Sequence, residues 1–337
     1  MRVVRPSLLV AALLALVLSG VGPAAATTYA PLNQRGPALS VPAGQLKASL
    51  TCSGSMRNLH RDPVLLVPGT TMNPQVNFSW NYERAFTRMG WTWCAVTLPY
   101  DATGDIQVAG EYVVNALRTM SSAAHRKVDV VGWSQGGMVP RWALRFWPDT
   151  RAMVGDLVGL SASNHGTLDS RLSCSPGSSC TPSFWQQAAG SHFLDALNSR
   201  AETFAGVDYT NAYTATDEIV TPNAGPTPSS GLYTGDGRIA NVSLQSICPG
   251  HVADHFAIGS YDAVGYAIVL DALTHAGPAS PARIPTAVCA EPFQPGVNPA
   301  TFATDYANFL AYAVNPAGDA AKVTAEPPLK RYVYARG

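Results

Sequence analysis

Charged side chains are scarce in this chain of 337 residues. They make up 13% of the sequence, whereas soluble domains usually contain about 25%. The 22 basic and 22 acidic side chains also balance, so the chain lacks the excess of positive charge with which proteins neutralise nucleic-acid phosphates. Because 47% of the residues are hydrophobic, it does not have the polar composition of a disordered chain either. We therefore expect a folded protein without a nucleic-acid partner.

Common metal-binding motifs are missing as well. The sequence contains no Cys-x-x-Cys pair and no His-Glu-x-x-His, which are frequent signatures of zinc sites. We expect neither a metal nor another cofactor. Cysteines of an exported protein usually form disulfides, and pairing between sequence neighbours would give Cys52–Cys94, Cys174–Cys180 and Cys248–Cys289. Other pairings of the six cysteines stay open at this point.

The first residues predict a removable leader. Arg2 and Arg5 form a short basic region, Leu8–Leu18 is an unbroken apolar stretch, and three alanines at 24–26 resemble a cleavage site. A membrane-spanning helix needs about 20 apolar residues, and this stretch stops short of that at Ser19. We expect residues 1–26 to be a secretory signal peptide and residues 27–337 to form a single extracellular domain with a short C-terminal extension and no transmembrane anchor.

Apolar runs typical of buried strands alternate along the chain with segments of helical periodicity. The strand-like runs are residues 63–67, 91–98, 128–131, 157–160, 209–213 and 239–247. The helical segments are residues 106–120, 138–147, 185–197 and 257–273. This alternation predicts an α/β protein with a mostly parallel central sheet and helices on both faces.

A candidate nucleophile follows one of these strands. Residues 132–136 read Gly-Trp-Ser-Gln-Gly, which fits the Gly-x-Ser-x-Gly turn that lifts a serine hydroxyl above a sheet between a strand and a helix. The glycines are needed because neighbouring backbone approaches too closely for a side chain. We expect Ser134 to be nucleophilic; the alternative is an inert serine in a glycine-rich turn.

A serine becomes a good nucleophile when a histidine accepts its proton and an acid orients that histidine. In proteins with this turn the acid follows the serine and the histidine comes last. Asp217 lies just after the strand-like run 209–213, and His255 lies in the loop between the next run and a helix. We expect these two residues to complete a triad, with Glu218 and His251 as the local alternatives.

Such a site also needs donors for the oxyanion that develops on the substrate carbonyl. The N–H group of Gln135, directly after the serine, is the first candidate. Thr70, in the turn after the run 63–67, could donate through its N–H group and its hydroxyl. An ordinary turn is the other interpretation of this segment.

Five stretches carry a family resemblance in matching order and at similar spacing. They are Leu66–Thr70, Trp133–Gly137, Trp185–Gln187, Ala215–Val220 and Asp254–His255. With these stretches the chain resembles the lipase B-like secreted lipases of the α/β-hydrolase superfamily. The resemblance implies hydrolysis of carboxylic esters, including triacylglycerols, by Ser134, Asp217 and His255, with Thr70 and Gln135 as oxyanion hole. It also implies disulfides at Cys52–Cys94 and Cys248–Cys289.

The resemblance further implies a set of substrate-binding residues. Trp133 would form the floor of the alcohol side, Thr167 and Gln187 would border the acyl side, and Ile219 and Val220 would line the cleft. Plain core packing is the alternative for each. The chain departs from the family at Gly132, where a threonine is usual, at Ser163, where a pocket aspartate is usual, and in its third disulfide.

Two further segments are candidates for the borders of the site, the first placed there by the resemblance and the second by its helical periodicity. The loop closed by Cys174 and Cys180 falls where the family has a small mobile lid, and we hypothesise that this disulfide stiffens the lid and weakens activation at a lipid interface. A late helical segment, residues 302–313, would either close the alcohol side or simply cover the core.

The sequence thus predicts a secreted serine-triad ester hydrolase, a triacylglycerol lipase that works through an acyl-enzyme. We expect a monomer that meets its ester or lipid substrate at an oil–water interface. The alternatives with the same triad are an esterase, a polyester hydrolase or an acyltransferase. An alternative of another class is a secreted binding protein on an inactive hydrolase scaffold.

Overall fold

Seven strands form one sheet in the computed structural model, which describes residues 28–336. The predicted leader, residues 1–26, lies outside the described residues. The strands are β1 (Leu50–Cys52), β2 (Val64–Val67), β3 (Trp93–Val96), β4 (Val128–Trp133), β5 (Val154–Leu160), β6 (Asp208–Tyr213) and β7 (Arg238–Ser243). Their order across the sheet is β1-β3-β2-β4-β5-β6-β7, and every neighbouring pair is parallel except β1 with β3. The prediction of a mostly parallel sheet is confirmed.

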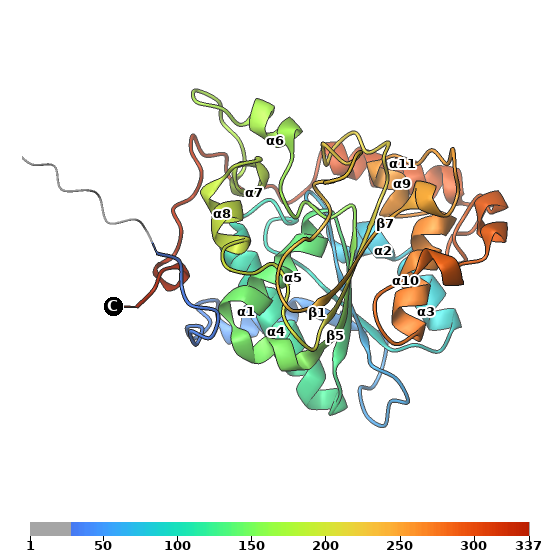
Figure 1. Cartoon of the computed structure of the whole chain (residues 1–337), viewed down its shortest axis with the longest axis horizontal. Helices are drawn as coiled ribbons and strands as arrows, with labels where there is room; N and C mark the ends of the chain where they lie inside the picture. The colour runs from blue at the N-terminus through green and yellow to red at the C-terminus, as the bar shows by residue number, and fades with distance from the viewer. Residues whose placement is uncertain (1–27, 337) are drawn as a thin grey trace, which may run out of the picture.

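Helices cover both faces of this sheet. The α-helices are α1 (Ala43–Ala48), α2 (Pro74–Phe78), α3 (Tyr82–Arg88), α4 (Ile106–Ala124), α5 (Gln135–Phe146), α6 (Leu168–Ser173), α7 (Pro182–Gln187), α8 (His192–Leu197), α9 (His255–Ile258), α10 (Ala263–Thr274) and α11 (Phe302–Val314). Short 3-10 helices span Pro148–Met153, Leu244–Ser246, Pro281–Arg283, Thr286–Ala290 and Arg331–Val333. Figure 1 shows α4 and α5 on one side of the sheet and α3 and α10 on the other.

The alternation of side chains along the strands produces two cores. On β2, Leu65 and Val67 pack with α4 and α5, whereas Val64 and Leu66 pack with α3 and α10. All four side chains are fully buried. A strand with both faces covered therefore reads as an uninterrupted apolar run, which is why β2 and β4 could be recognised in the sequence.

Several predicted segments are shorter or more broken than their apolar pattern indicated, among them the predicted strand 91–98, which is reduced to β3. The predicted helix 185–197 is interrupted after α7, because Gly190 has a positive φ of 85° and the hydroxyl of Ser191 caps the start of α8. The predicted helix 257–273 is split because Asp262 accepts from the N–H of Gly265 and starts α10 as a separate helix. The predicted strand 239–247 ends at Ser243, whose hydroxyl caps the 3-10 helix that follows.

Three disulfides join the cysteines in the sequence-neighbour pairing. Cys52–Cys94 links β1 to β3, Cys174–Cys180 closes the connection between α6 and α7, and Cys248–Cys289 fastens the loop before α9 to a later 3-10 helix. All three predicted pairs are thus formed.

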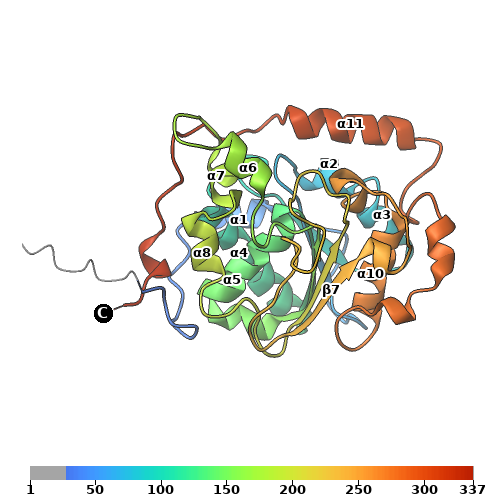
Figure 2. The same ribbon diagram turned by 45° about the horizontal axis from the view of Figure 1, so that its top comes forward.

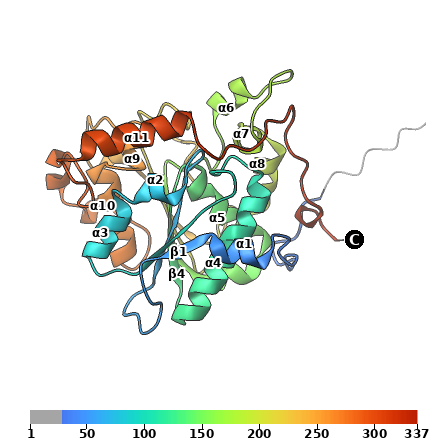
Figure 3. The same cartoon turned by 180° about the vertical axis from the view of Figure 1, so that it is seen from behind.

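After α11 the chain runs back across the molecule past α7 and α8 to the N-terminal segment (Figure 3). Along this path Cys180 and Val323 exchange two main-chain hydrogen bonds, and Glu326 accepts from the N–H groups of His192 and Phe193. Near its end, Val333 accepts from the N–H of Ala30. The C-terminal segment therefore fastens the loop between α6 and α7, and the start of α8, to the start of the described chain.

One segment, His255–Thr274, is long and apolar enough to cross a membrane by length and composition. It comprises α9 and α10, and 78% of its apolar window is buried inside the protein. It is a core segment of the fold in the described part of the chain.

Buried carboxyl groups cluster where β4 and β5 begin. Asp129 on β4 is only 4% exposed, accepts from the N–H of Asp156 on β5, and has the guanidinium of Arg61 at 3.6 Å. Burial, with the nearby charge of Asp62, raises the pKa of Asp129 to about 7 against the attraction of Arg61. Burial and the charge of Asp129 raise the pKa of Asp156 to about 8. At neutral pH this pair therefore favours a partly protonated state.

This cluster predicts how stability depends on pH. Both pKa values are higher in the folded protein, so the folded state binds more protons than the unfolded state. The stabilisation that these two groups contribute is therefore fully present below about pH 4 and is lost as the pH rises through their folded pKa values of about 7 and about 8. Asp129→Asn removes one titrating group and keeps an oxygen acceptor for Asp156. We expect its melting temperature to decline less between pH 6 and pH 9, by roughly 2–4 °C.

The measurement is thermal unfolding at several pH values, with the exposed Asp236→Asn as a control. Parallel curves for Asp129→Asn and the unaltered protein would contradict this account of the cluster.

Candidate active site

Ser134 lies at the sharp turn from β4 into α5. Its φ of 55° and ψ of −127° are uncommon for a residue with a side chain. A Cβ atom on Gly132 would lie 2.0 Å from the carbonyl oxygen of Gly136, and one on Gly136 would lie 2.1 Å from that of Val67. Both glycines of the predicted motif are therefore sterically required. This close packing of the backbone fixes the turn that carries Ser134 at the end of β4.

Asp217 lies in the loop after β6 and its side chain is fully buried. One carboxylate oxygen accepts from the N–H groups of Ile219 at 3.0 Å and Val220 at 2.7 Å. The other oxygen accepts from the side chain of Asn223 at 3.2 Å and faces Nδ1 of His255 at 3.1 Å. Burial by itself would raise the pKa of Asp217, but the charge and hydrogen bond of His255 and the N–H of Val220 lower it below its ordinary value. Asp217 is thus held as a carboxylate.

His255 is the first residue of α9, and its ring is 3% exposed. While Nδ1 faces Asp217, the main-chain carbonyl of His255 accepts from the indole N–H of Trp133 at 3.0 Å. The ring also lies against Trp133, with ring centroids 5.2 Å apart. His255 therefore faces the acid on one side and the residue next to Ser134 on the other.

The two local alternatives for acid and histidine have other partners. His251 lies 2.6 Å from Asp262, the residue that caps α10, and this hydrogen bond raises the pKa of His251. Glu218 accepts from the main-chain N–H of His255 at 2.9 Å, so it holds the backbone of this residue, whereas its neighbour Asp217 faces the ring.

The two predicted oxyanion-hole residues are connected through Gln187. Its amide nitrogen donates to the hydroxyl of Thr70 at 2.9 Å and to the side-chain oxygen of Gln135 at 3.2 Å. The hydroxyl of Ser163 donates to the amide oxygen of Gln187 at 2.8 Å, which fixes the amide orientation. Because the Thr70 oxygen accepts from Gln187, its own hydrogen remains available to a ligand.

A cavity of about 220 Å³ brings these residues together. It is lined by Ser134, His255 and Thr70, and by all five predicted substrate-binding residues, Trp133, Thr167, Gln187, Ile219 and Val220. The ring of Trp133 fills the space next to Gly69 and Gly259, where a Cβ atom would lie 2.6 Å and 2.3 Å from it.

Several lining residues were missed in the sequence. They are Thr71, Asp169, Ser170, Phe184, Phe256 and Val314, whereas Ala313 lies within the predicted late helix 302–313. Asp169 and Ser170 belong to α6 and Ala313 and Val314 to α11, and Figure 2 places both helices at the same end of the molecule. The late helix 302–313 thus has both roles considered for it, since Phe309 is buried against Trp133 while its last turn borders the cavity.

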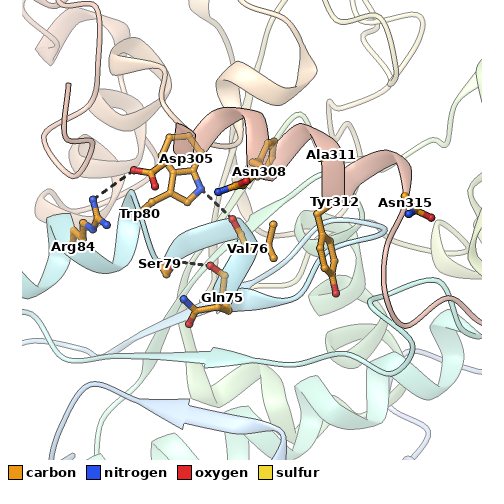
Figure 4. A pocket seen from close by; sticks show the side chains of 11 residues that line it. Gln75, Val76, Ser79, Trp80, Arg84, Asp305, Asn308, Ala311, Tyr312 and Asn315 are labelled. Atoms are coloured by element: carbon orange, nitrogen blue, oxygen red, sulfur yellow. Dashed lines mark hydrogen bonds and ion pairs between the residues drawn. The ribbon is translucent and has the colours of Figure 1, made fainter. Parts of the chain in front are cut away.

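A larger groove lies between α11 and the helices α2 and α3 (Figure 4). It is lined by polar side chains such as Gln75, Asn308 and Asn315, and the pair Arg84 and Asp305 is 3.9 Å apart. Ser134 and His255 are not among its lining residues. Within residues 28–336, no group of three or more His, Cys, Asp or Glu side chains could hold a metal ion.

Comparisons with known proteins find similarity to lipases. The family model described as lipase (class 2) matches residues 61–240. Lipase B of Pseudozyma antarctica is 38% identical over 251 residues, which span 71% of this chain and 72% of that protein. The crystal structure of lipase B from Aspergillus fumigatus matches with a TM-score of 0.81 and 29% identity, over 93% of this chain and 76% of that one.

The contact between His251 and Asp262 predicts a second pH effect. Since the hydrogen bond raises the pKa of His251, its stabilisation is fully present below about pH 6.5 and is lost as the pH rises through the higher folded value. We expect His251→Gln to lower the melting temperature at pH 5.5 by ~1–3 °C, an amount limited by solvent screening. Above pH 8 the melting curves of variant and unaltered protein should coincide; an equal loss at both pH values would contradict the assignment.

Proposed function

The chain belongs to the class 2 lipases, and we propose that it is a secreted triacylglycerol lipase that hydrolyses carboxylic esters through an acyl-enzyme on Ser134. The observation that carries the proposal is that His255, which is hydrogen-bonded to Asp217, lines the same cavity as Ser134. A general base held by a buried carboxylate can take the serine proton as the hydroxyl attacks the ester carbonyl.

The proposed reaction has two halves. In the first, Ser134 attacks, His255 accepts its proton and passes it to the leaving alcohol, and the acyl group stays on the serine. In the second, His255 takes a proton from the attacking water and passes it to the oxygen of Ser134, which leaves as the carboxylic acid is released. Asp217 keeps the imidazole in one tautomer and stabilises its positive charge. No step requires a metal or another cofactor.

The oxyanion of each tetrahedral intermediate is proposed to bind Gln135 and Thr70. The N–H of Gln135 belongs to the first turn of α5, where it has no acceptor within the helix. The Thr70 hydroxyl is oriented by Gln187. One such donor contributes about 3 kcal/mol to transition-state stabilisation, because it is fixed before the charge develops.

We also propose roles for the remaining pocket residues. Trp133 forms the floor of the alcohol side, where it lies against the His255 ring. Thr167 and Gln187 border the acyl side, while Ile219 and Val220 line the cleft beside the triad. The hydroxyl of Thr167 donates to the carbonyl of Ile219, which ties the two walls together.

Export and a single-domain organisation complete the proposal. The three disulfides are typical of an extracellular protein, and the predicted signal peptide and the secreted relatives that the sequence resembles point the same way. One continuous sheet supports a single catalytic domain over residues 27–337. We propose that the enzyme acts as a monomer on esters at an oil–water interface.

Covalent labelling tests the proposed nucleophile. A fluorophosphonate should form one adduct on Ser134 of the unaltered protein and none on Ser134→Ala, with peptide mass spectrometry as the readout. His255→Ala should lower kcat for p-nitrophenyl butyrate by about four or more powers of ten, because the serine loses its base. His251→Ala is the matched control and should retain most activity. An unlabelled Ser134 would refute the proposed mechanism.

The disulfide beside α6 leads to a prediction about interfacial activation. Cys174–Cys180 and the pairing of Cys180 with Val323 restrain the helix that carries Asp169 and Ser170. By lowering the conformational entropy of the unfolded chain, a disulfide that closes so short a loop stabilises the folded state by about 2 kcal/mol. We therefore expect no large increase in rate when the substrate exceeds its solubility limit, and a larger one for the variant with Cys174→Ser and Cys180→Ser.

Initial rates on tributyrin below and above saturation measure this effect. A large increase for the unaltered enzyme that the double replacement leaves unchanged would contradict the restraint.

A further inference from the structure

The acid loop after β6 and the histidine loop before α9 are joined at several points. The hydroxyls of Thr214 and Thr216 both donate to the carbonyl of Ala253, at 2.9 Å and 2.7 Å. The N–H of Ala253 points back to the Thr216 hydroxyl at 3.3 Å. Two residues further along each loop, the carboxylate of Glu218 accepts from the N–H of His255. The loops are therefore aligned residue by residue over this stretch.

His255 is held at two separate atoms by two consecutive carboxylates. Asp217 faces the ring nitrogen Nδ1 at 3.1 Å, and Glu218 accepts from the main-chain nitrogen at 2.9 Å. The first contact restricts rotation of the ring, whereas the second restricts the position of the backbone that carries it. The N–H of His255 that donates to Glu218 lies in the first turn of α9, where a backbone N–H has no carbonyl acceptor within the helix. A hydrogen bond to a carboxylate is stronger than one between neutral groups.

We propose that Glu218 is a positioning residue for His255 in ester hydrolysis. The inference rests on the proposed function, because it assumes that His255 is the general base. Without the Glu218 contact, the main-chain nitrogen of His255 loses its hydrogen bond. The start of α9 is then held less firmly relative to Ser134, although Trp133 still donates to the His255 carbonyl. A displacement of about 1 Å at a reacting group can lower a rate about a hundredfold.

The environment of Glu218 separates this role from a general role in stability. Glu218 is exposed. Within residues 28–336 its side chain takes part in one hydrogen bond, which it accepts from the N–H of His255. The titratable groups beside it are its sequence neighbour Asp217, His255, whose N–H it accepts a hydrogen bond from, and Tyr306, which its charge reaches. Because no core packing is lost with this side chain, its removal should leave the fold intact.

The experiment compares Glu218→Ala with Glu218→Gln, whose amide oxygen can accept the same hydrogen bond. Glu291→Ala, an exposed glutamate far along the chain, is the control. For p-nitrophenyl butyrate we expect Glu218→Ala to lower kcat by ~10–100-fold with KM within about twofold. Fluorophosphonate labelling of Ser134 should slow in parallel. Glu218→Gln should stay within about threefold of the unaltered kcat, and Glu291→Ala should match it.

Two results would overturn the proposal: an unchanged kcat in Glu218→Ala, or an equal loss in Glu218→Ala and Glu218→Gln, which would assign the effect to charge. Thr216→Val, which removes both hydrogen bonds between the Thr216 hydroxyl and Ala253 but keeps the side-chain shape, tests the same alignment should Glu218→Ala fold poorly. Its kcat should fall with an unchanged KM and melting temperature; a loss of activity that merely follows a loss of stability would refute positioning. If the unaltered protein itself is not labelled on Ser134, the proposed function fails instead.

Discussion

The site depends on the close approach of three backbone segments around Ser134, namely the end of β4, the start of α5 and the end of β2. The turn from β4 into α5 brings Gly136 against Val67 of β2, and Gly132 against Gly136, at separations that leave no room for a Cβ atom. A positive φ at Ser134 costs about 1–3 kcal/mol and persists only where the surroundings fix it. Here the surroundings are parallel strands that are buried on both faces. The stability of the core is thus what maintains the conformation of the proposed nucleophile.

The other groups of the site are fixed in a different way, by polar contacts between loops. Asp217 is held by the N–H groups that follow it, Thr70 by Gln187, and His255 by Glu218 and Trp133. Hydrogen bonds of this kind are modest individually, but each satisfies a buried or partly buried group that would otherwise be costly. The rigid sheet therefore sets where the strands end, and the loop contacts decide how the side chains face one another.

Much of this arrangement could be predicted because it is encoded locally. The Gly-x-Ser-x-Gly turn, the apolar runs of β2 and β4 and the positions of Asp217 and His255 after strands are visible without tertiary information. The breaks in the helices near Gly190 and Asp262 were missed, since caps compete with apolar periodicity over only a few residues. The carboxyl cluster of Asp129 and Asp156 was missed as well, because it depends on the register of β4 against β5.

Helical periodicity left two roles open for α11, and the contribution of α6 to the pocket could not be derived from spacing, because both helices reach the site through contacts between segments that are distant in sequence. Both helices also expose apolar side chains near the cavity. Val314 on α11 is 83% exposed and Leu172 on α6 is 80% exposed, at the same end of the fold as the cavity. Among the residues that line the cavity, Asp169 and His255 are the ionisable ones within the described chain. Apolar side chains left in water on the rim cost free energy, roughly 25 cal/mol for each Å². A water-insoluble ester can cover this surface, so the feature that opposes solubility also favours the proposed substrate.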